Sequence, residues 1–229
     1  MQRAIFMDSL IYKHSAIMDK YDPRKRIALV VDEWGGWYDV AKGTNPGFLY
    51  QQNTMRDAMI AGVTLNIFNN HSDRVRMANL AQSINVLQAV ILTKEEKMIL
   101  TPTYHVMEMY NVHQDAKLLP LTITSNDYVI GNKKLPAVSA SASKDSTGVT
   151  HISLVNIDAI KAQSISLDLK GGNYKNVTGR ILSSGKLQDF NSFESPNKIT
   201  PAIFKGAKLT SNKLSLTLPP FSVVVLELK

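Results

Sequence analysis

The chain has 229 residues, of which 44% are hydrophobic and 20% are charged, which is ordinary for a globular protein with a sizeable core. It has no cysteine, which excludes disulfide bridges and thiolate metal sites. The formal net charge of +7 arises within residues 117–229, where fourteen Lys and Arg face seven Asp and Glu and only Arg180 is an arginine. Scattered lysines are typical of solvated strands, whereas phosphate-binding surfaces cluster their basic residues beside aromatic ones. We therefore expect no nucleic-acid partner.

No apolar stretch approaches the ~18 residues that a membrane-spanning helix needs. The acidic residue Asp8 falls where a signal peptide would keep its apolar segment. We expect a soluble chain with no membrane partner.

The first half of the chain alternates helical and strand patterns. Apolar residues between Phe6 and Met18 recur at three- and four-residue spacing, which predicts a helix ended by Asp22-Pro23. The continuous apolar run that leads into Asp32 predicts a strand buried on both faces. After a loop rich in Gly and Pro we expect, in order, a helix near Phe48–Ala61, a strand over Val63–Phe68, and helices over Val75–Ala81 and Thr103–Tyr110. Such alternation predicts βα units and a parallel sheet.

The second half reads as all-β. Polar and apolar residues alternate strictly in Ser164–Leu169, as a half-buried antiparallel strand requires. The small, polar stretch Ser139–Gly148 predicts a loop. The other expected strands are Val149–Ile157, Val177–Leu182, Lys213–Leu218 and Ser222–Leu228. We therefore predict two domains, an α/β unit over residues 1–116 and an antiparallel β-sandwich over residues 117–229.

The clearest candidate for chemistry is the segment that follows the buried strand. Glu33 stands at the expected carboxyl end of that strand, where active sites of parallel α/β folds lie. Trp34, Trp37 and Tyr38 follow at once, so an ionisable oxygen lies beside flat apolar rings, as a sugar site needs. Taken alone, Glu33 is more often a loop carboxylate or a helix cap than a nucleophile.

These residues resemble the nucleophile segment of the α-L-arabinofuranosidases of glycoside hydrolase family 51. One departure is Gly35, where many members carry Asn, which could alter a hydrogen bond near the sugar. The resemblance extends in order through Gly43–Phe48, Gln52–Asp57, His71–Gln82, Asn85–Gln88, Leu100–His105 and, more weakly, Leu218–Leu226.

The resemblance implies a C-terminal portion of a longer enzyme: about strands 7 and 8 of a (β/α)8 TIM barrel, followed by the β-sandwich. A complete barrel needs about eight strands and roughly 200 residues or more, and the first half of this chain offers two strands. We accordingly expect the N-terminal strands to be absent. Members of the family are often homo-oligomers, and the compartment, whether bacterial cytoplasm, periplasm or outside the cell, stays open.

The resemblance also implies roles for individual residues. Glu33 would be the nucleophile of a retaining glycosidase, Trp37 a substrate-binding aromatic and Gln82 an amide that hydrogen-bonds the arabinose. The implied substrate is an arabinose-containing oligo- or polysaccharide, with no cofactor and no metal. The family's acid/base glutamate lies in an Asn-Glu segment that this sequence lacks, so we expect the isolated chain to be inactive.

Two alternatives stay open: a non-catalytic carbohydrate-binding or interaction module, and a related retaining glycosidase of different sugar specificity. For the neighbouring residues we expect structural roles. Trp34 should pack in the barrel wall, Asp32 should hold the strand end, and Asp73 should pair with Arg74 or Arg76. The five histidines show no metal-binding spacing.

Overall fold

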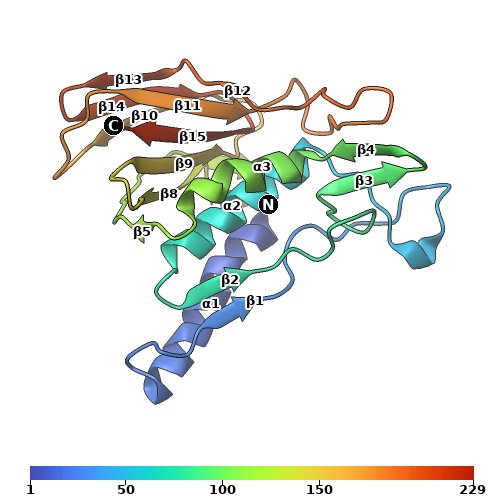
Figure 1. The fold of residues 1–229 in the computed structure, drawn as a ribbon, viewed down its shortest axis with the longest axis horizontal. Helices are drawn as coiled ribbons and strands as arrows, with labels where there is room; N and C mark the ends of the chain where they lie inside the picture. The colour runs from blue at the N-terminus through green and yellow to red at the C-terminus, as the bar shows by residue number, and fades with distance from the viewer.

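The computed structural model describes all residues 1–229 and forms three layers, namely helices, a six-stranded sheet and a three-stranded sheet (Figure 1). Helix α1 (Gln2–Tyr21) leads into strand β1 (Leu29–Val31). Strand β1 pairs in parallel with β2 (Val75–Ala78), and helix α2 (Met55–Asn70) connects them. The hairpin β3 (Ile91–Lys94) and β4 (Lys97–Leu100) follows, and then helix α3 (Pro102–Tyr110). This strand–helix–strand unit is the end of a (β/α)8 barrel.

The remaining strands form an antiparallel β-sandwich. The larger sheet has the order β12-β11-β15-β9-β8-β5, and the smaller has the order β10-β14-β13. A separate hairpin joins β6 (Asp127–Ile130) to β7 (Lys133–Pro136). The other bounds are β5 (Lys117–Leu118), β8 (Val138–Lys144), β9 (Thr150–Asn156), β10 (Gln163–Asp168), β11 (Val177–Leu182), β12 (Ala202–Ile203), β13 (Ala207–Thr210), β14 (Lys213–Leu218) and β15 (Ser222–Leu228). The fold class predicted from the sequence is confirmed.

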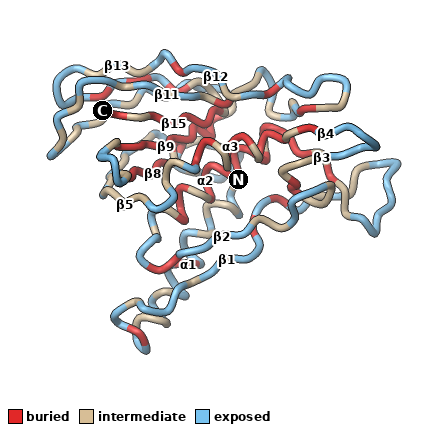
Figure 2. Tube along the Cα trace, viewed as in Figure 1, coloured by how far each residue is buried: buried red, intermediate tan, exposed pale blue.

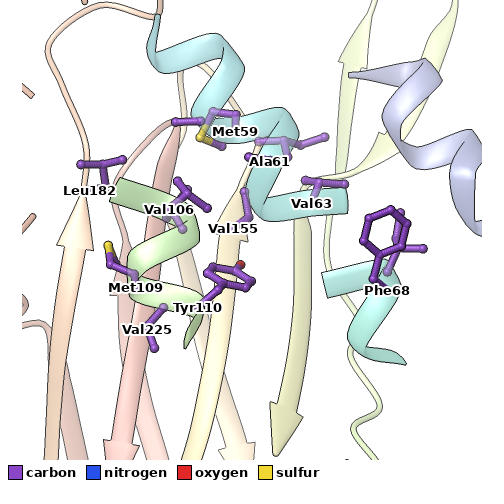
Figure 3. Packing of buried hydrophobic residues seen from close by; sticks show 14 of the residues in the cluster. Met59, Ala61, Val63, Phe68, Val106, Met109, Tyr110, Val155, Leu182 and Val225 are labelled. Atoms are coloured by element: carbon purple, nitrogen blue, oxygen red, sulfur yellow. The ribbon is translucent and has the colours of Figure 1, made fainter. Parts of the chain in front are cut away.

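The central strands of the larger sheet are buried on both faces, and strand β15 shows how. Val223 and Val225 belong to a core shared with α2 and α3, whereas Val224 and Leu226 belong to a second core shared with the small sheet. Because side chains alternate across a strand, a sheet covered on both faces needs a continuous apolar run, as here. Figure 3 shows the first core, in which Val106 and Met109 of α3 lie beside Val155 and Val225 of the sheet.

Burial falls away toward β1, β2 and α1 (Figure 2). On β1, Leu29 and Val31 pack against the first core, while Val30 between them is 43% exposed. Its partner in the register, Met77 of β2, is 55% exposed. One face of the parallel pair is therefore covered by helices, and the other, which faces inward in a closed barrel, is open.

Two predicted elements around α2 were wrong. Residues Val63–Phe68, expected as a strand, form the second half of α2. The helix begins at Met55 rather than Phe48, because Thr54 and Asp57 form a capping box at its first turn. Helix α2 lies between β1 and β2 on one side and the sandwich on the other, so nearly all of its faces are apolar and its helical period is hidden.

Two further predictions were wrong because long-range pairing outweighs local pattern. Val75–Ala81 was expected as a helix, but Val75–Ala78 is strand β2, which is held by the ladder to β1. Ser139–Gly148 was expected as a loop, but most of it lies in strand β8, which pairs along its whole length with β9. The serines of β8 face α2, where Asn66 and Asn69 bond to Ser141.

The ion pairs also differ from expectation. Asp73 pairs with Lys25, not with Arg74 or Arg76. Arg74 is buried and instead bonds Asp19 and Asp22 at the end of α1. This pairing holds the end of α1 against the turn that precedes β2.

Candidate active site

The candidate site begins where β1 ends. Asp32 accepts a hydrogen bond from the Asn79 side chain across 3.0 Å, so it joins the ends of the two parallel strands. The sequence had indicated that it holds the strand end, but through backbone or an arginine rather than an asparagine. Glu33 is exposed, and no ion pair engages its carboxylate. Trp34 is 6% exposed and packs edge-to-face on Phe68 with ring centroids 5.6 Å apart. Of the two adjacent exposed acids, Asp32 is engaged by Asn79, whereas the Glu33 carboxylate has no ion-pair partner.

One buried amide, Gln88, ties together the segments that carry Glu33 and Gln82. Its Nε2 donates to the carbonyl of Trp34 at 2.9 Å and to the carbonyl of Ala81. Trp34 follows Glu33, and Ala81 precedes Gln82, so both candidate residues project from backbone held by the same nitrogen. Gly35 lies against this amide with φ +112°, and a Cβ there would lie 2.8 Å from the Gln88 Cγ. The position therefore suits glycine.

A second buried amide positions Trp37. Gln51 accepts from the Tyr38 N–H at 2.9 Å and donates to the Gly36 carbonyl at 2.8 Å. These two bonds hold the backbone on either side of Trp37, whose side chain is 67% exposed. The Tyr38 ring carries the Arg56 guanidinium 3.5 Å from its centroid. Burial raises the pKa of Tyr38 above its ordinary value, and Arg56 opposes that shift.

The third amide, Asn53, is fully buried and links the site to α3. Its Nδ2 bonds Thr103 Oγ1 at 2.8 Å and the carbonyl of Gln88 at 3.3 Å, and its Oδ1 accepts from the Thr103 N–H. The backbone of the segments that carry the exposed Glu33 and Trp37 is thus held by three buried neutral amides, Gln51, Asn53 and Gln88. Such buried, hydrogen-bonded groups favour a single loop conformation.

Gln82 is exposed and lies at the edge of a cavity of about 550 Å³. Phe48 and Tyr50, from the segment between β1 and α2, line the same cavity, together with Asn85 and Thr93 near the β3–β4 hairpin. Burial raises the pKa of Tyr50 above its ordinary value, so its hydroxyl stays protonated and able to donate.

A long loop of the sandwich, residues 183–201, supports these segments from below. The carbonyls of Asp189 and Leu187 accept from the N–H groups of Met55 and Arg56 at 2.9 and 3.0 Å, which satisfies the free donors at the start of α2. Asn191 is 1% exposed and donates to the Leu100 carbonyl at the end of β4. The sandwich therefore takes part in holding the loops around the site.

The structure thus places Glu33 and Gln82 on adjoining segments and Trp37 on a separately anchored loop. The sequence indicated those exposed residues but not the buried amides that hold them. Gln88 and Asn53 were visible as parts of matching motifs, yet nothing local indicated their partners. Within residues 1–229 no group of three or more His, Asp or Glu is arranged to hold a metal ion. None of the helices combines the length and apolarity needed to cross a bilayer.

Known proteins resemble this chain in sequence and fold. The profile of the α-L-arabinofuranosidase C-terminal domain matches residues 32–222. An intracellular exo-α-L-arabinofuranosidase of Bacteroides ovatus is 49% identical over the whole chain, which spans 45% of that protein. The intracellular exo-α-(1→5)-L-arabinofuranosidase of Bifidobacterium longum is 25% identical over 89% of the chain and 41% of its own length.

Among solved structures, the GH51 arabinofuranosidase from Xanthomonas axonopodis pv. citri superposes with a TM-score of 0.98 at 48% identity. The match covers 100% of this chain and 46% of that one. The chain therefore spans about half the length of the relatives it matches. With nearly its whole length matched, the chain belongs to the α-L-arabinofuranosidase C-terminal domain family of glycoside hydrolase family 51.

Proposed function

We propose that these residues form the C-terminal portion of a retaining α-L-arabinofuranosidase and supply its nucleophile, Glu33. The observation that carries the proposal is the free Glu33 carboxylate at the carboxyl end of β1, on a segment that Gln88 joins to that of Gln82. Residues 1–116 would be the end of the catalytic barrel, and residues 117–229 the sandwich that supports it.

In this reaction the Glu33 carboxylate attacks the anomeric carbon of an arabinofuranosyl group, and the glycosidic bond to the leaving oxygen breaks. A second carboxylic acid, about 5–5.5 Å away, protonates that oxygen. The ionised acid then removes a proton from water, which attacks the glycosyl-enzyme ester and releases arabinose with retained configuration. The second acid would come from the barrel strands that the longer relatives contain and these residues do not.

Two other side chains would bind the sugar. The Gln82 amide can both donate to and accept from hydroxyl groups. The exposed Trp37 indole offers an apolar face for the furanose ring. The substrates would be arabinan, arabinoxylan or their oligosaccharides, from which terminal α-L-arabinofuranosyl groups are removed. The open inner face at Val30 and Met77 supports the proposal that further barrel strands complete the site.

A chimera tests the proposal. The part of the Bacteroides ovatus relative that precedes the matching region is joined to residues 1–229, and hydrolysis of 4-nitrophenyl α-L-arabinofuranoside is measured. We expect turnover by the chimera, a loss of at least about 1,000-fold in kcat with Glu33→Gln, and no turnover by residues 1–229 alone. Asp32→Asn is the matched control for charge, because Asp32 only joins the strand ends. Full activity of the Glu33→Gln chimera would contradict the assignment, and turnover by residues 1–229 alone would contradict the need for a second segment.

A further inference from the structure

Arg56, in the first turn of helix α2, packs against the loop that carries Trp37. Its guanidinium carbon lies 3.5 Å from the centroid of the Tyr38 ring, well within the roughly 6 Å at which a cation is attracted to an aromatic face. Its Nη2 donates to Asp57 Oδ2 at 3.3 Å, whereas its buried Nε has no acceptor. The stack on Tyr38 is therefore a principal contact of this guanidinium.

The position of Arg56 is not explained by the stability of its own helix. The N-terminus of a helix carries partial positive charge, so a cation in the first turn is unfavourable. The capping box of Thr54 and Asp57 already satisfies that end of α2 without Arg56. The bond to Asp57 offsets part of the cost, but a neutral residue would not incur it. The side-chain contact of Arg56 that serves another part of the molecule is the stack on Tyr38.

The Tyr38 ring also lies against Gly36, two residues earlier in the loop. A Cβ on Gly36 would lie 2.5 Å from Tyr38 Cε2, so the ring occupies space that any larger residue would need. Trp37, between them, is 67% exposed, whereas Gly36 is buried and Tyr38 is half-buried. The loop therefore turns the Tyr38 ring inward and the Trp37 indole outward. Because the two residues share a peptide unit, holding the first ring orients the second.

The sandwich fixes the backbone of Arg56. The Leu187 carbonyl, in the loop of residues 183–201, accepts from the Arg56 N–H at 3.0 Å. That N–H is one of the free donors at the start of a helix, so the bond satisfies a group that α2 itself cannot. Arg56 thus contacts the sandwich through its backbone and the loop through its side chain. A continuous series of contacts runs from Leu187 through Arg56 and Tyr38 to Trp37.

We propose that Arg56 is a positioning residue that links the sandwich loop to Trp37 and holds the indole in place for the sugar. The inference rests on the proposed role of Trp37 and adds to the site a residue that need not touch substrate. Such a residue affects how the sugar is bound rather than the reaction of the Glu33 carboxylate. Its loss should therefore raise KM and leave kcat nearly unchanged.

A double-mutant cycle in the chimera tests the link between Arg56 and Trp37. Arg56→Met removes the charge and the planar group but keeps a long side chain. With 4-nitrophenyl α-L-arabinofuranoside we expect it to raise KM at least about threefold with kcat within about twofold, and Arg56→Lys, which keeps the cation without the plane, to give an intermediate KM. In the Trp37→Ala background, Arg56→Met should change KM by less than about 1.5-fold, because the side chain that Arg56 positions is gone.

The matched control is Arg24→Met, at an exposed arginine ahead of β1, which should leave kcat and KM unchanged. An equal effect of Arg56→Met on KM with and without the Trp37 indole would overturn the proposal. A loss of kcat at unchanged KM would overturn it as well.

A second measurement needs no substrate. The chain has two tryptophans, so Trp34→Phe leaves Trp37 as the only one. Time-resolved fluorescence anisotropy of residues 1–229 in that background reports how freely the Trp37 indole moves. We expect Arg56→Met to increase the amplitude of the fast, sub-nanosecond decay at least about 1.5-fold, and Arg24→Met to leave it unchanged.

The two measurements separate the proposals from each other. An anisotropy decay that Arg56→Met leaves unchanged would overturn the positioning role of Arg56. Turnover that survives Glu33→Gln, or a KM that Trp37→Ala leaves unaltered, would instead overturn the proposed function of those residues. The anisotropy would still decide whether Arg56 holds the indole.

Discussion

Replacing Gln88 with methionine removes the one donor that joins the Glu33 and Gln82 segments. Methionine has nearly the same length and volume, so the change tests the hydrogen bonds rather than the packing. In the protein, Gln88 is 5% exposed and its Nε2 serves two carbonyls, those of Trp34 and Ala81.

The expected cost follows from the surroundings of those carbonyls. The bond to the Trp34 carbonyl is buried and that to the Ala81 carbonyl is partly buried, so both oxygens would lose a partner away from bulk water. Leaving a buried acceptor without a partner costs about 1–3 kcal/mol, and a partly buried one lies at the low end. We expect Gln88→Met to lower the free energy of unfolding by about 2–4 kcal/mol and to lower kcat/KM of the chimera by at least tenfold.

Urea denaturation of residues 1–229, followed by tryptophan fluorescence, measures the stability change, because Trp34 lies in the affected segment. Arabinofuranoside hydrolysis by the chimera measures the effect on the site. The exposed Gln188→Met in the sandwich loop is the matched control and should change stability by less than about 0.5 kcal/mol. A loss below about 0.5 kcal/mol for Gln88→Met, with unchanged kcat/KM, would refute the view that this amide holds both segments.

Two other predictions concern the sandwich. Asn191→Ala removes three hydrogen bonds, to the Leu100 carbonyl and to both backbone groups of Ile199, and should cost about 3 kcal/mol in urea denaturation. The control variant, Asn173→Ala at an exposed position, should cost under about 0.5 kcal/mol. If Asn191→Ala cost no more than Asn173→Ala, the supporting role of the loop 183–201 would be contradicted. The pKa of His113 is lowered to about 4, mainly because burial disfavours the imidazolium and also because of nearby His151. In the unfolded chain the pKa of a histidine is about 6.5, so between about pH 6.5 and 4 the unfolded chain binds a proton at His113 that the folded chain does not. The free energy of unfolding should therefore fall as the pH drops from about 6.5 to about 4. His113→Gln should flatten that part of the curve of unfolding free energy against pH, and an unchanged slope would contradict it.

The sequence alone determined the features that depend on local order. The apolar strand before Asp32 and the position of Glu33 after it were readable because an apolar strand ending in polar residues has one usual meaning in α/β folds. The expectation that this strand is buried on both faces was wrong, since Val30 is 43% exposed. Strict alternation predicted β10, because that strand has one covered face. The motifs that resemble family 51 named Glu33, Trp37 and Gln82.

Tertiary structure decided the elements whose partners are distant in the chain. Val63–Phe68 is helical because it continues α2, and its helical period was concealed because most sides of α2 are buried. Val75–Ala78 and Ser139–Lys144 are strands because β1 and β9 supply their hydrogen bonds, although their own residues favour other states. The same holds for the site: Gln51, Asn53 and Gln88 act through carbonyls and hydroxyls that only folding brings within bonding distance, whereas the exposed residues they position are marked by their own chemistry.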